Sequence, residues 1–555
     1  MKRVFLILCI LVIVLPLRAQ LSSGEIDALV NRTLRTFDVP GISVCVIKDK
    51  KIVHARGYGV RSLNTKQPVD EHTLFGIASN SKAFTAAALG MLVEEGKLKW
   101  DSRVTDFIPE FKMYDPYVTA EFTIRDLLTH RSGLGLGAGD LMFWPDENNF
   151  TKTDIIYNLR YLKPVSSFRS KYDYDNLLYI VAGEVVARVS GSSWETFIQK
   201  RFFDPLDIRT AAPSFHLLKD KFNVIDPHFY VDGKLQVIRR DWSENANAAG
   251  GIYASVTDMS KWMLALLNGG KYGDKQLFSA ATLRELWSPQ TLLPLGSPGP
   301  YNTQFAAYGL GWVLNDVKGH KQVSHTGGLA GIVTQTVIIP DLDLAILVYT
   351  NQQSGAAFNA ISNTIKDAYL GGKANEDWVD FYHKRVTAAK KEADEILAKV
   401  EAEIRKNTDG AAGTPATGSG AGTSRPSVAR PTATQPSVAR PNVARPNTAQ
   451  PAAACPSFEV KGIYADPWFG EVEISEKEGQ LWFASKRSSR LTGPMYYYKG
   501  NTYIVRWTDR SMDADAYLVF SLDTEGAARG IKISAISPLT DFSFDFQDLD
   551  LNRKK

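Results

Sequence analysis

The chain has 555 residues, too many for one compact core, because domains typically contain about 100 to 200 residues. Charged residues make up 22% of it and the formal net charge is +4, which is close to ordinary globular composition. The sequence has no basic segment concentrated enough to indicate nucleic-acid binding, and its three cysteines do not indicate a disulfide framework. We therefore expect at least two folded domains and no nucleic-acid partner.

The N-terminus has the pattern of an export signal. Lys2 and Arg3 precede an apolar run over residues 4–17, and the small residue Ala19 follows. The run is shorter than the roughly 20 apolar residues that span a bilayer. We expect a signal peptide over residues 1–19, a periplasmic or secreted protein of a bacterial cell envelope, and no stable membrane span after cleavage.

The first domain is expected over residues 20–372 and has an α+β pattern. Its ends alternate like strands and its middle has helical spacing. This order predicts one antiparallel sheet shared by both ends of the domain, flanked by helices and interrupted by a helical insertion. The expected helices cover residues 26–37, 82–95, 124–128, 177–189, 258–267 and 356–369, and the expected strands cover residues 41–47, 52–57, 311–314, 323–325, 332–339 and 344–349.

Three further segments follow. Residues 373–407 predict an amphipathic helix that either docks back on the protein or pairs with a partner, docking being favoured. Residues 408–456 are rich in Pro, Ala and Thr and predict a disordered linker, whose arginines leave contact with an anionic envelope polymer open. Residues 457–555 predict a small all-β domain, with alternating runs at 458–464, 470–475, 481–485, 495–507, 517–522 and 542–546.

Ser79 and Lys82 form the first candidate catalytic pair. At this spacing a hydroxyl and an amine share one face of a helix, so a lysine of lowered pKa can accept the proton of an attacking serine. Alone the pair is a weak signal, because such spacing arises by chance in a chain of this length. The alternative interpretation is a capped helix with an exposed lysine.

Two later elements strengthen the pair. Tyr174 and Asn176 precede an expected helix, where a phenol can relay a proton and an amide can hold a substrate or the lysine. His325, Thr326 and Gly327 end one expected strand, and the glycine permits close approach to a ligand. A second Tyr-x-Asn, at Tyr349 and Asn351, is interpreted as structural.

In this order, these three elements resemble the penicillin-recognising serine hydrolases, specifically the class C β-lactamase and D-alanyl-D-alanine peptidase branch, over residues 24–370. The resemblance implies a β-lactamase/transpeptidase-like fold and an acyl-enzyme mechanism without metal or cofactor. It implies Ser79 as nucleophile, Lys82 and Tyr174 as acid and base in undecided order, and the backbone N–H groups of Ser79 and Gly328 as the oxyanion site. It also implies that the substrate contacts Asn176, His325, Thr326 and Gly327.

One departure from that family bears on the substrate. His325 stands where many members carry lysine, so a fixed positive charge is replaced by a group that titrates at about pH 6.5. This favours hydrolysis of an amide or ester in a small molecule or peptide, with D-amino-acid peptides and cell-wall material as candidates. Class C-like β-lactamase activity and a non-catalytic scaffold remain the alternatives.

Three other features were interpreted with less specific roles. His130 and Cys45 are expected to be structural. The C-terminal domain resembles the small lipocalin-like module appended to such hydrolases, and its role is left open between capping the active site, binding envelope material and stabilising the chain. Its aromatic residues are expected to form its core.

Overall fold

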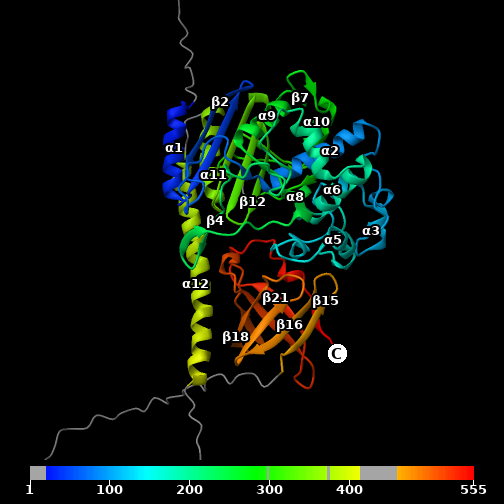
Figure 1. Ribbon diagram of the computed structural model, residues 1–555, viewed down its shortest axis with the longest axis vertical. Helices are drawn as coiled ribbons and strands as arrows, with labels where there is room; N and C mark the ends of the chain where they lie inside the picture. Colours follow the sequence, from blue (N-terminus) through cyan, green and yellow to red (C-terminus); the bar gives the residue numbers. More distant parts are fainter. Residues whose placement is uncertain (1–20, 297–298, 372–375, 413–458, 555) are drawn as a thin grey trace, which may run out of the picture.

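The computed structural model describes residues 21–296, 299–371, 376–412 and 459–554. An α+β body contains the large sheet and its helices, and a separate barrel lies next to it (Figure 1). The expected signal peptide and most of the expected linker lie outside the described residues. The α+β prediction, with a separate all-β domain, is confirmed.

The main sheet has eight antiparallel strands in the order β2-β1-β14-β13-β12-β11-β10-β9. The N-terminal hairpin pairs with β14, so the two ends of the domain share one sheet, as predicted. Its strands are β1 (Gly41–Lys48), β2 (Lys51–Gly59), β9 (Thr291–Leu292), β10 (Ala306–Tyr308), β11 (Val313–Val317), β12 (His320–Leu329), β13 (Ile332–Ile339) and β14 (Leu344–Thr350).

Helices cover both faces of this sheet. The main ones are α1 (Ser23–Thr36), α2 (Lys82–Glu94), α4 (Ile124–Leu127), α6 (Leu177–Ser190), α8 (Asn247–Gly250), α9 (Val256–Leu267), α10 (Ala280–Leu286) and α11 (Gly355–Tyr369). The other helices of this domain are α3 (Pro116–Glu121), α5 (Lys152–Asn158) and α7 (Trp194–Ile198). Four N-termini, those of α1, α4, α5 and α9, have a capping box in which a serine or threonine and an acidic residue satisfy each other's backbone N–H groups.

Alternate residues of β1 enter two different cores. Val44 and Val46 pack with α1 and α11, whereas Cys45 and Ile47 pack with the helical insertion around α2. Successive side chains of a strand point to opposite faces, so a strand covered on both sides is apolar throughout. The buried thiol of Cys45 has a pKa raised to about 12 by burial, in agreement with its interpretation as a structural residue.

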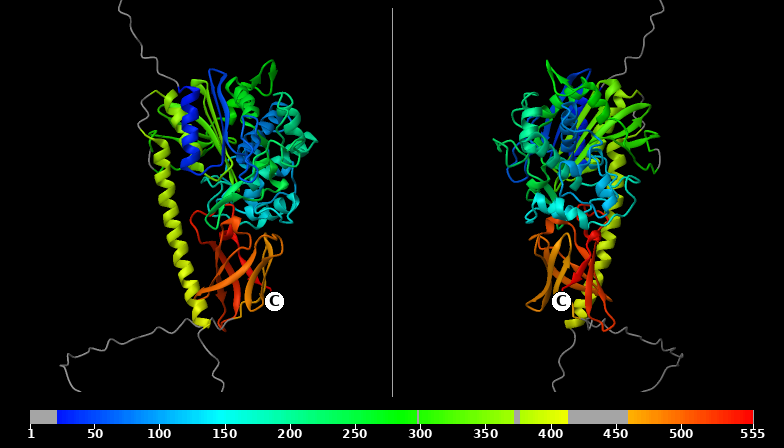
Figure 2. Two further views of the ribbon diagram at one scale, coloured as in Figure 1. Left: turned by 60° about the vertical axis from the view of Figure 1, so that its left-hand side comes forward. Right: turned by 90° about the vertical axis from the view of Figure 1, so that its right-hand side faces the viewer.

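The amphipathic helix α12 (Trp378–Ala412) begins and ends five residues later than the range predicted from sequence. Its first turn packs against α11 through Trp378 and Val379, and Val400 and Ile404 pack further along against barrel residues. Figure 2 shows it running along the side of the molecule from one body to the other. In this structure the helix docks on its own chain.

The C-terminal domain is a closed barrel of eight antiparallel strands in sequential order. The strands are β15 (Gly462–Asp466), β16 (Gly470–Lys477), β17 (Gln480–Ser485), β18 (Thr492–Lys499), β19 (Thr502–Val505), β20 (Ala516–Leu522), β21 (Ala528–Ala535) and β22 (Leu551–Arg553). The run predicted over 495–507 is two strands, and β21 and β22 were not predicted. Of the aromatic residues expected in its core, Trp468, Phe469 and Trp507 are buried, whereas Trp482 and Tyr496, Tyr497 and Tyr498 are only half-buried.

The strand predicted over residues 542–546 is wrong. These residues belong to the loop between β21 and β22, which ends in the short 3₁₀ turn η9 (Phe546–Asp548). Phe544 and Phe546 are buried, whereas Phe542 is 41% exposed. Side-chain carboxylates hold this loop in the absence of strand pairing. Asp541 accepts a hydrogen bond from the N–H of Ser543, and Asp545 accepts one from the N–H of Gly139 in the other domain.

Buried polar contacts hold the barrel against the α+β body. Arg490, in the loop between β17 and β18, forms an ion pair with Asp241 in which both side chains are almost fully buried. Arg487 pairs with Asp154 at 3.0 Å, and the Asn158 side chain donates to the backbone oxygen of Trp468. The contacts link residues 249 to 333 positions apart in the chain, so the two bodies form one structural unit.

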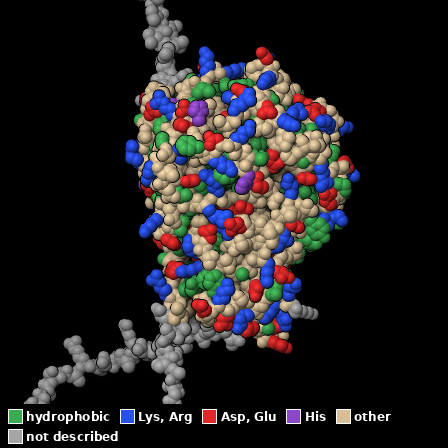
Figure 3. Space-filling view, in the orientation of Figure 1, with side chains coloured by type: hydrophobic (Ala, Val, Ile, Leu, Met, Phe, Trp, Pro, Cys, Tyr) green, Lys and Arg blue, Asp and Glu red, His purple; other side chains and the backbone are tan. Residues whose placement is uncertain are grey.

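The face of the described residues drawn in Figure 3 shows no concentration of one charge. Basic and acidic side chains are interspersed over the face drawn in Figure 3. Within the described ranges, none of the helices is both long and apolar enough to cross a membrane.

Candidate active site

Ser79 lies at the junction between a short strand and a buried helix. β3 (Phe75–Gly76) pairs with β6 (Tyr253–Ala254), the 3₁₀ turn η1 (Ala78–Ser81) follows β3, and α2 begins at Lys82. Ala78 has φ of 49°, a left-handed conformation that costs a residue with a β-carbon about 1–3 kcal/mol. This sharp turn leaves Ser79 half-buried and facing a cleft.

Lys82 is fully buried directly behind Ser79. Its Nζ lies 3.1 Å from Ser79 Oγ and donates to Asn176 Oδ1 at 2.7 Å and to the backbone oxygen of Ala249 at 2.9 Å. Two aromatic rings flank the amine, those of Tyr174 at 4.8 Å and Tyr179 at 5.2 Å from ring centroid to Nζ. The amine therefore has three polar neighbours in an otherwise closed pocket.

Burial lowers the pKa of Lys82 to about 7, although Asp140 and Asp175 act in the opposite direction. A substantial fraction of the amine is then neutral near pH 7. Both the Asn176 and the Ala249 oxygen can only accept hydrogen bonds, so they hold the two N–H groups of the neutral amine. The remaining lone pair is directed at Ser79 Oγ, which is the arrangement needed to remove the hydroxyl proton.

Tyr174 lies on the other side of Ser79. Burial raises the pKa of the Tyr174 phenol well above its usual range, and the interaction with Ser79 lowers it by less. Among the described residues its buried hydroxyl has no hydrogen-bond partner, and Tyr174 and Ser79 line the same cleft. A phenol in this state donates a proton rather than accepting one.

The ring of His130 packs against Tyr174, with centroids 4.3 Å apart. His130 Nδ1 accepts from the Asp175 N–H at 3.0 Å, and burial lowers the pKa of the imidazole well below its usual range. The neutral ring does not line the cleft, which agrees with the structural interpretation. Its contribution is to hold Tyr174 and the residues that follow it.

Asn176 connects Lys82 to a buried acid. Its Nδ2 donates to Asp140 Oδ2 at 2.8 Å while its Oδ1 accepts from Lys82. Asp140 Oδ2 also accepts from Ser543 Oγ of the barrel at 2.8 Å. Of the two uses of Asn176 considered from sequence, the structure contains the one in which it holds the lysine, and one Nδ2 hydrogen is left for a substrate.

The edge of β12 forms the opposite side of the site. A β-carbon on Gly327 would lie 2.2 Å from the backbone oxygen of Ile77, so only glycine lets this strand approach the segment that carries Ser79. Thr326 and Gly328 are exposed beside Ser79 and line the cleft. Thus the strand presents a side-chain hydroxyl and a backbone segment to the same space.

His325 is neutral in this environment. Burial lowers the pKa of the imidazole to about 4, and Lys82 lowers it further. Nδ1 is 2.6 Å from the backbone oxygen of Thr326, which can only accept, so Nδ1 carries the hydrogen and Nε2 accepts from the Tyr308 hydroxyl at 3.0 Å. The conditional positive charge expected at this position is therefore absent at neutral pH.

The cleft in front of Ser79 has a volume of about 250 Å³ and is rich in aromatic side chains. Both domains contribute to its wall. Its lining consists of Ser79, Phe143, Trp144, Tyr172, Tyr174, Asn176, Trp242, Tyr308, Val313, His325, Thr326, Gly328, Leu329, Asp541, Phe542 and Ser543.

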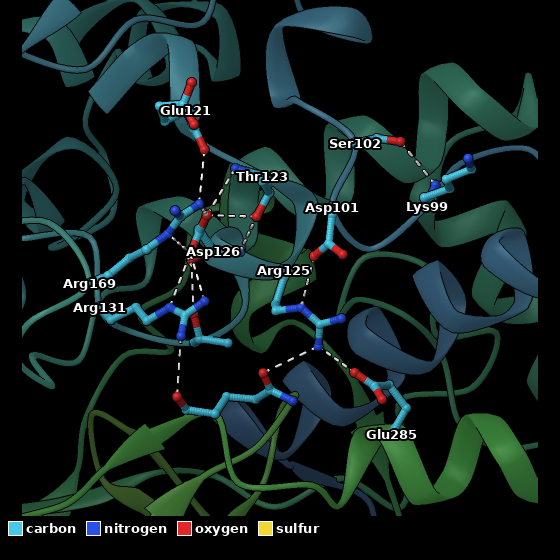
Figure 4. A network of polar contacts seen from close by, with 12 residues as sticks. Lys99, Asp101, Ser102, Glu121, Thr123, Arg125, Asp126, Arg131, Arg169 and Glu285 are labelled. Atoms are coloured by element: carbon cyan, nitrogen blue, oxygen red, sulfur yellow. Dashed lines mark hydrogen bonds and ion pairs between the residues drawn. The ribbon is translucent and has the colours of Figure 1, made fainter. Parts of the chain in front are cut away.

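Asp126 joins the two loops that carry His130 and Tyr174. Its side chain is fully buried and accepts from Arg169 at 2.6 and 3.0 Å, from Arg131 at 3.1 Å and from Thr123 at 2.6 Å. In Figure 4 both guanidinium groups converge on this carboxylate, while Arg125 makes separate contacts to Asp101 and Glu285. Burial acts to raise the pKa of Asp126, but these hydrogen bonds outweigh it and hold the pKa below its usual value.

Asp126→Ala is expected to lower the free energy of unfolding by about 3 kcal/mol, because it leaves Arg131 and Arg169 without their shared acceptor. The low end of the usual range applies since Arg169 is 39% exposed and remains partly hydrated. The stabilisation is present above the unfolded-state pKa of about 3.9 and is lost as pH falls through the lower folded-state pKa. Urea unfolding at pH 7 and pH 3 measures both effects.

Asp101→Ala is the matched control, because Asp101 pairs with Arg125 but is 81% exposed. It is expected to leave the unfolding transition almost unchanged. Equal transitions for Asp126→Ala and Asp101→Ala would contradict the bridging role.

The structure gathers Ser79, Lys82, Tyr174, Asn176, His325, Thr326, Gly327 and Gly328 around one cleft. Tyr349 and Asn351 lie elsewhere: Tyr349 is fully buried, and Asn351 bonds to the backbone of Gly41, Val60 and Arg61. The sequence did not identify Asp140, Tyr308 or the barrel residues 541–543. Tyr308 could have been found, because it begins Tyr-Gly-Leu-Gly-Trp at residues 308–312, a further stretch of the sequence that resembles the family. No local signal marks the others.

Comparison with known proteins identifies the family and the fold. A model of the Beta-lactamase family matches residues 26–369, and a model of a domain of unknown function, DUF3471, matches residues 449–553. The solved structure of the octameric penicillin-binding protein homologue from Pyrococcus abyssi aligns with a TM-score of 0.56 and 18% identity, covering 96% of this chain and 100% of that one.

Curated relatives match a smaller part of this chain than that structure does. Unguisins hydrolase ungD of Aspergillus violaceofuscus is 29% identical over 65% of this chain and 67% of its own length. Protein flp of Staphylococcus aureus is 24% identical over 60% of this chain and 64% of its own length. The chain thus aligns with about two thirds of each relative. Since the family match covers more than half of the chain, the chain belongs to the Beta-lactamase family.

Proposed function

We propose that the chain is an exported serine hydrolase that forms an acyl-enzyme at Ser79 and hydrolyses an ester or an amide. Ser79 Oγ attacks the carbonyl carbon, and the neutral amine of Lys82 accepts the hydroxyl proton. The backbone N–H groups of Ser79 and Gly328 hold the oxyanion, and Tyr174 donates a proton to the leaving group. Water then loses a proton to the Tyr174 phenolate as it attacks the acyl-enzyme, and Lys82 returns its proton to Ser79 Oγ as the acid is released.

The environment of Lys82 carries this proposal. An amine 3.1 Å from Ser79 Oγ, with two acceptor oxygens on its hydrogens and a pKa lowered to about 7, is suited to serve as the base. The raised pKa of Tyr174 suits it to the acid role instead. A non-catalytic scaffold has no need for an amine held in this state. Two fungal relatives named unguisins hydrolases also support hydrolysis.

β-Lactamase activity is the less favoured alternative. β-Lactam antibiotics carry a carboxylate, and His325 is neutral at the position where many family members carry lysine. No lysine or arginine is among the described residues that line the cleft.

Export rests on the N-terminal sequence pattern alone, and fractionation of the expressing cells tests it.

Turnover of three chromogenic probes by the full chain tests the proposal. A p-nitrophenyl ester or an amino-acid p-nitroanilide is expected to be hydrolysed, whereas a chromogenic cephalosporin is expected to be a poor substrate. Loss of the activity in Ser79→Ala assigns it to this site. Rapid Ser79-dependent loss of the cephalosporin would favour a β-lactamase, and no turnover of any probe would favour the scaffold.

A further inference from the structure

The barrel loop between β21 and β22 reaches the catalytic residues. Phe542 packs edge-on against Tyr174, with ring centroids 5.9 Å apart and an interplanar angle of 85°. A β-carbon on Gly137 would lie 2.8 Å from both the ring and the backbone oxygen of Phe542, so glycine is needed for this approach. Gly137 has φ of 71°, and its N–H donates to the backbone oxygen of Tyr174.

Two hydrogen bonds fix this loop in place. Ser543 Oγ donates to Asp140, which also accepts from Asn176, and Asp545 accepts from the N–H of Gly139. Asp541, Phe542 and Ser543 consequently form a wall of the cleft that faces Ser79. The wall thus comes from the barrel and not from the catalytic domain.

The charge of the cleft is unbalanced. Among the described residues that line it, Asp541 is the only one with a carboxylate, amine or guanidinium side chain, and His325 is neutral. Burial raises the pKa of Asp541 above its usual value, and hydrogen bonds from Ser543 oppose this shift. Lys82 lies behind Ser79 with its amine held by protein oxygens. A substrate carboxylate would meet a like charge and no free cation, whereas an ammonium group would meet a carboxylate among aromatic rings, which also attract cations.

We propose that residues 541–543 form a substrate-selecting wall, in which Asp541 pairs with a protonated amine of the substrate and Phe542 packs on its apolar side chain. The inference rests on the proposed hydrolase function and deepens it. The acyl donor is then an ester or amide of an amino acid with a free amino group. Substrates whose free carboxylate must enter the cleft are disfavoured.

Equilibrium binding to the full-length Ser79→Ala chain tests this proposal without turnover. The probes are phenylalaninamide, N-acetylphenylalaninamide and N-acetylphenylalanine, each in both enantiomers, which share one side chain and are cationic, neutral and anionic. Calorimetry is expected to show that the cation of one enantiomer binds about tenfold or more tightly than the neutral probe, and that the anion binds weakest. Adding Asp541→Asn should abolish the preference, and adding Phe542→Ala should weaken binding of the cationic and neutral probes several-fold.

Asn at position 541 keeps an oxygen that accepts from the Ser543 N–H, so the loop is expected to fold normally. Glu525→Gln removes the same charge from the β20–β21 turn, and Leu522→Ala removes a side chain as exposed as Phe542, at 41%. Both controls should bind like the parent. Equal affinity for the three probes, no binding of the cation, or a preference that survives Asp541→Asn would overturn the inference. Loss of the hydrolase function would instead appear as absent Ser79-dependent turnover in the wild type.

Discussion

Ser79→Ala is expected to lower turnover of any accepted ester or amide by about 10⁶-fold, because the hydroxyl that forms the acyl-enzyme is absent. Lys82 and Tyr174 have no nucleophile to activate in this variant, so their presence recovers none of the rate. Substrate binding should be retained, since the cleft walls are unchanged. Steady-state kinetics with a p-nitrophenyl ester, corrected for spontaneous hydrolysis, measures the loss.

Ser81→Ala is the matched control for this prediction. Ser81 lies on the same turn, but its hydroxyl accepts from the N–H of Ile252 and does not line the cleft. This substitution is expected to cost about 1 kcal/mol of stability and to leave the chemical step intact. If Ser79→Ala retained turnover comparable with that of Ser81→Ala, Ser79 would not be the nucleophile.

Replacement of Lys82 is expected to lower turnover by about 10²–10⁴-fold, the usual contribution of a general base. Lys82→Arg keeps a positive charge but cannot accept a proton, and Lys82→Met keeps the length of the chain without the amine. Both variants should therefore lose activity to a similar extent. Comparing their kcat/KM values with that of the wild type, after melting curves confirm folding, measures this.

The pH profile separates a base from a fixed charge. Because the neutral amine is the reactive form, wild-type kcat/KM should rise with pH through an apparent pKa near 7, the value to which burial lowers Lys82. This rising limb should be missing in Lys82→Met. Full activity in Lys82→Arg, or an unchanged profile in Lys82→Met, would assign the proton to another group.

The catalytic pair was predictable because its geometry is local. Ser79 and Lys82 are three positions apart, which places both side chains on one face of a helix. In the structure Lys82 Nζ lies 3.1 Å from Ser79 Oγ. Tyr174 and His325 were predictable through their order and neighbours along the chain. The protonation state of His325 was not predictable, because the neutral ring results from burial and from the Tyr308 hydroxyl, and both depend on tertiary packing.

The barrel wall of the cleft was misread for a physical reason. Phe542, Phe544 and Phe546 alternate as in a strand, but they have different surroundings. Phe546 packs against Trp507 of the barrel, Phe544 lies buried against Trp144, and the exposed Phe542 packs against Tyr174. Asp140 carries no sequence signal, since only its burial between Asn176 and Ser543 distinguishes it from a surface acid. Contacts between residues 403 positions apart in the chain are invisible to local patterns.

Intact mass spectrometry of the full chain, quenched in acid within the first turnovers of an activated p-nitrophenyl ester, tests the acyl-enzyme most directly. The account predicts one added acyl group in the wild type, located on Ser79 by peptide mapping, and none in Ser79→Ala. Turnover without any adduct at any quench time, or an adduct that persists in Ser79→Ala, would contradict it.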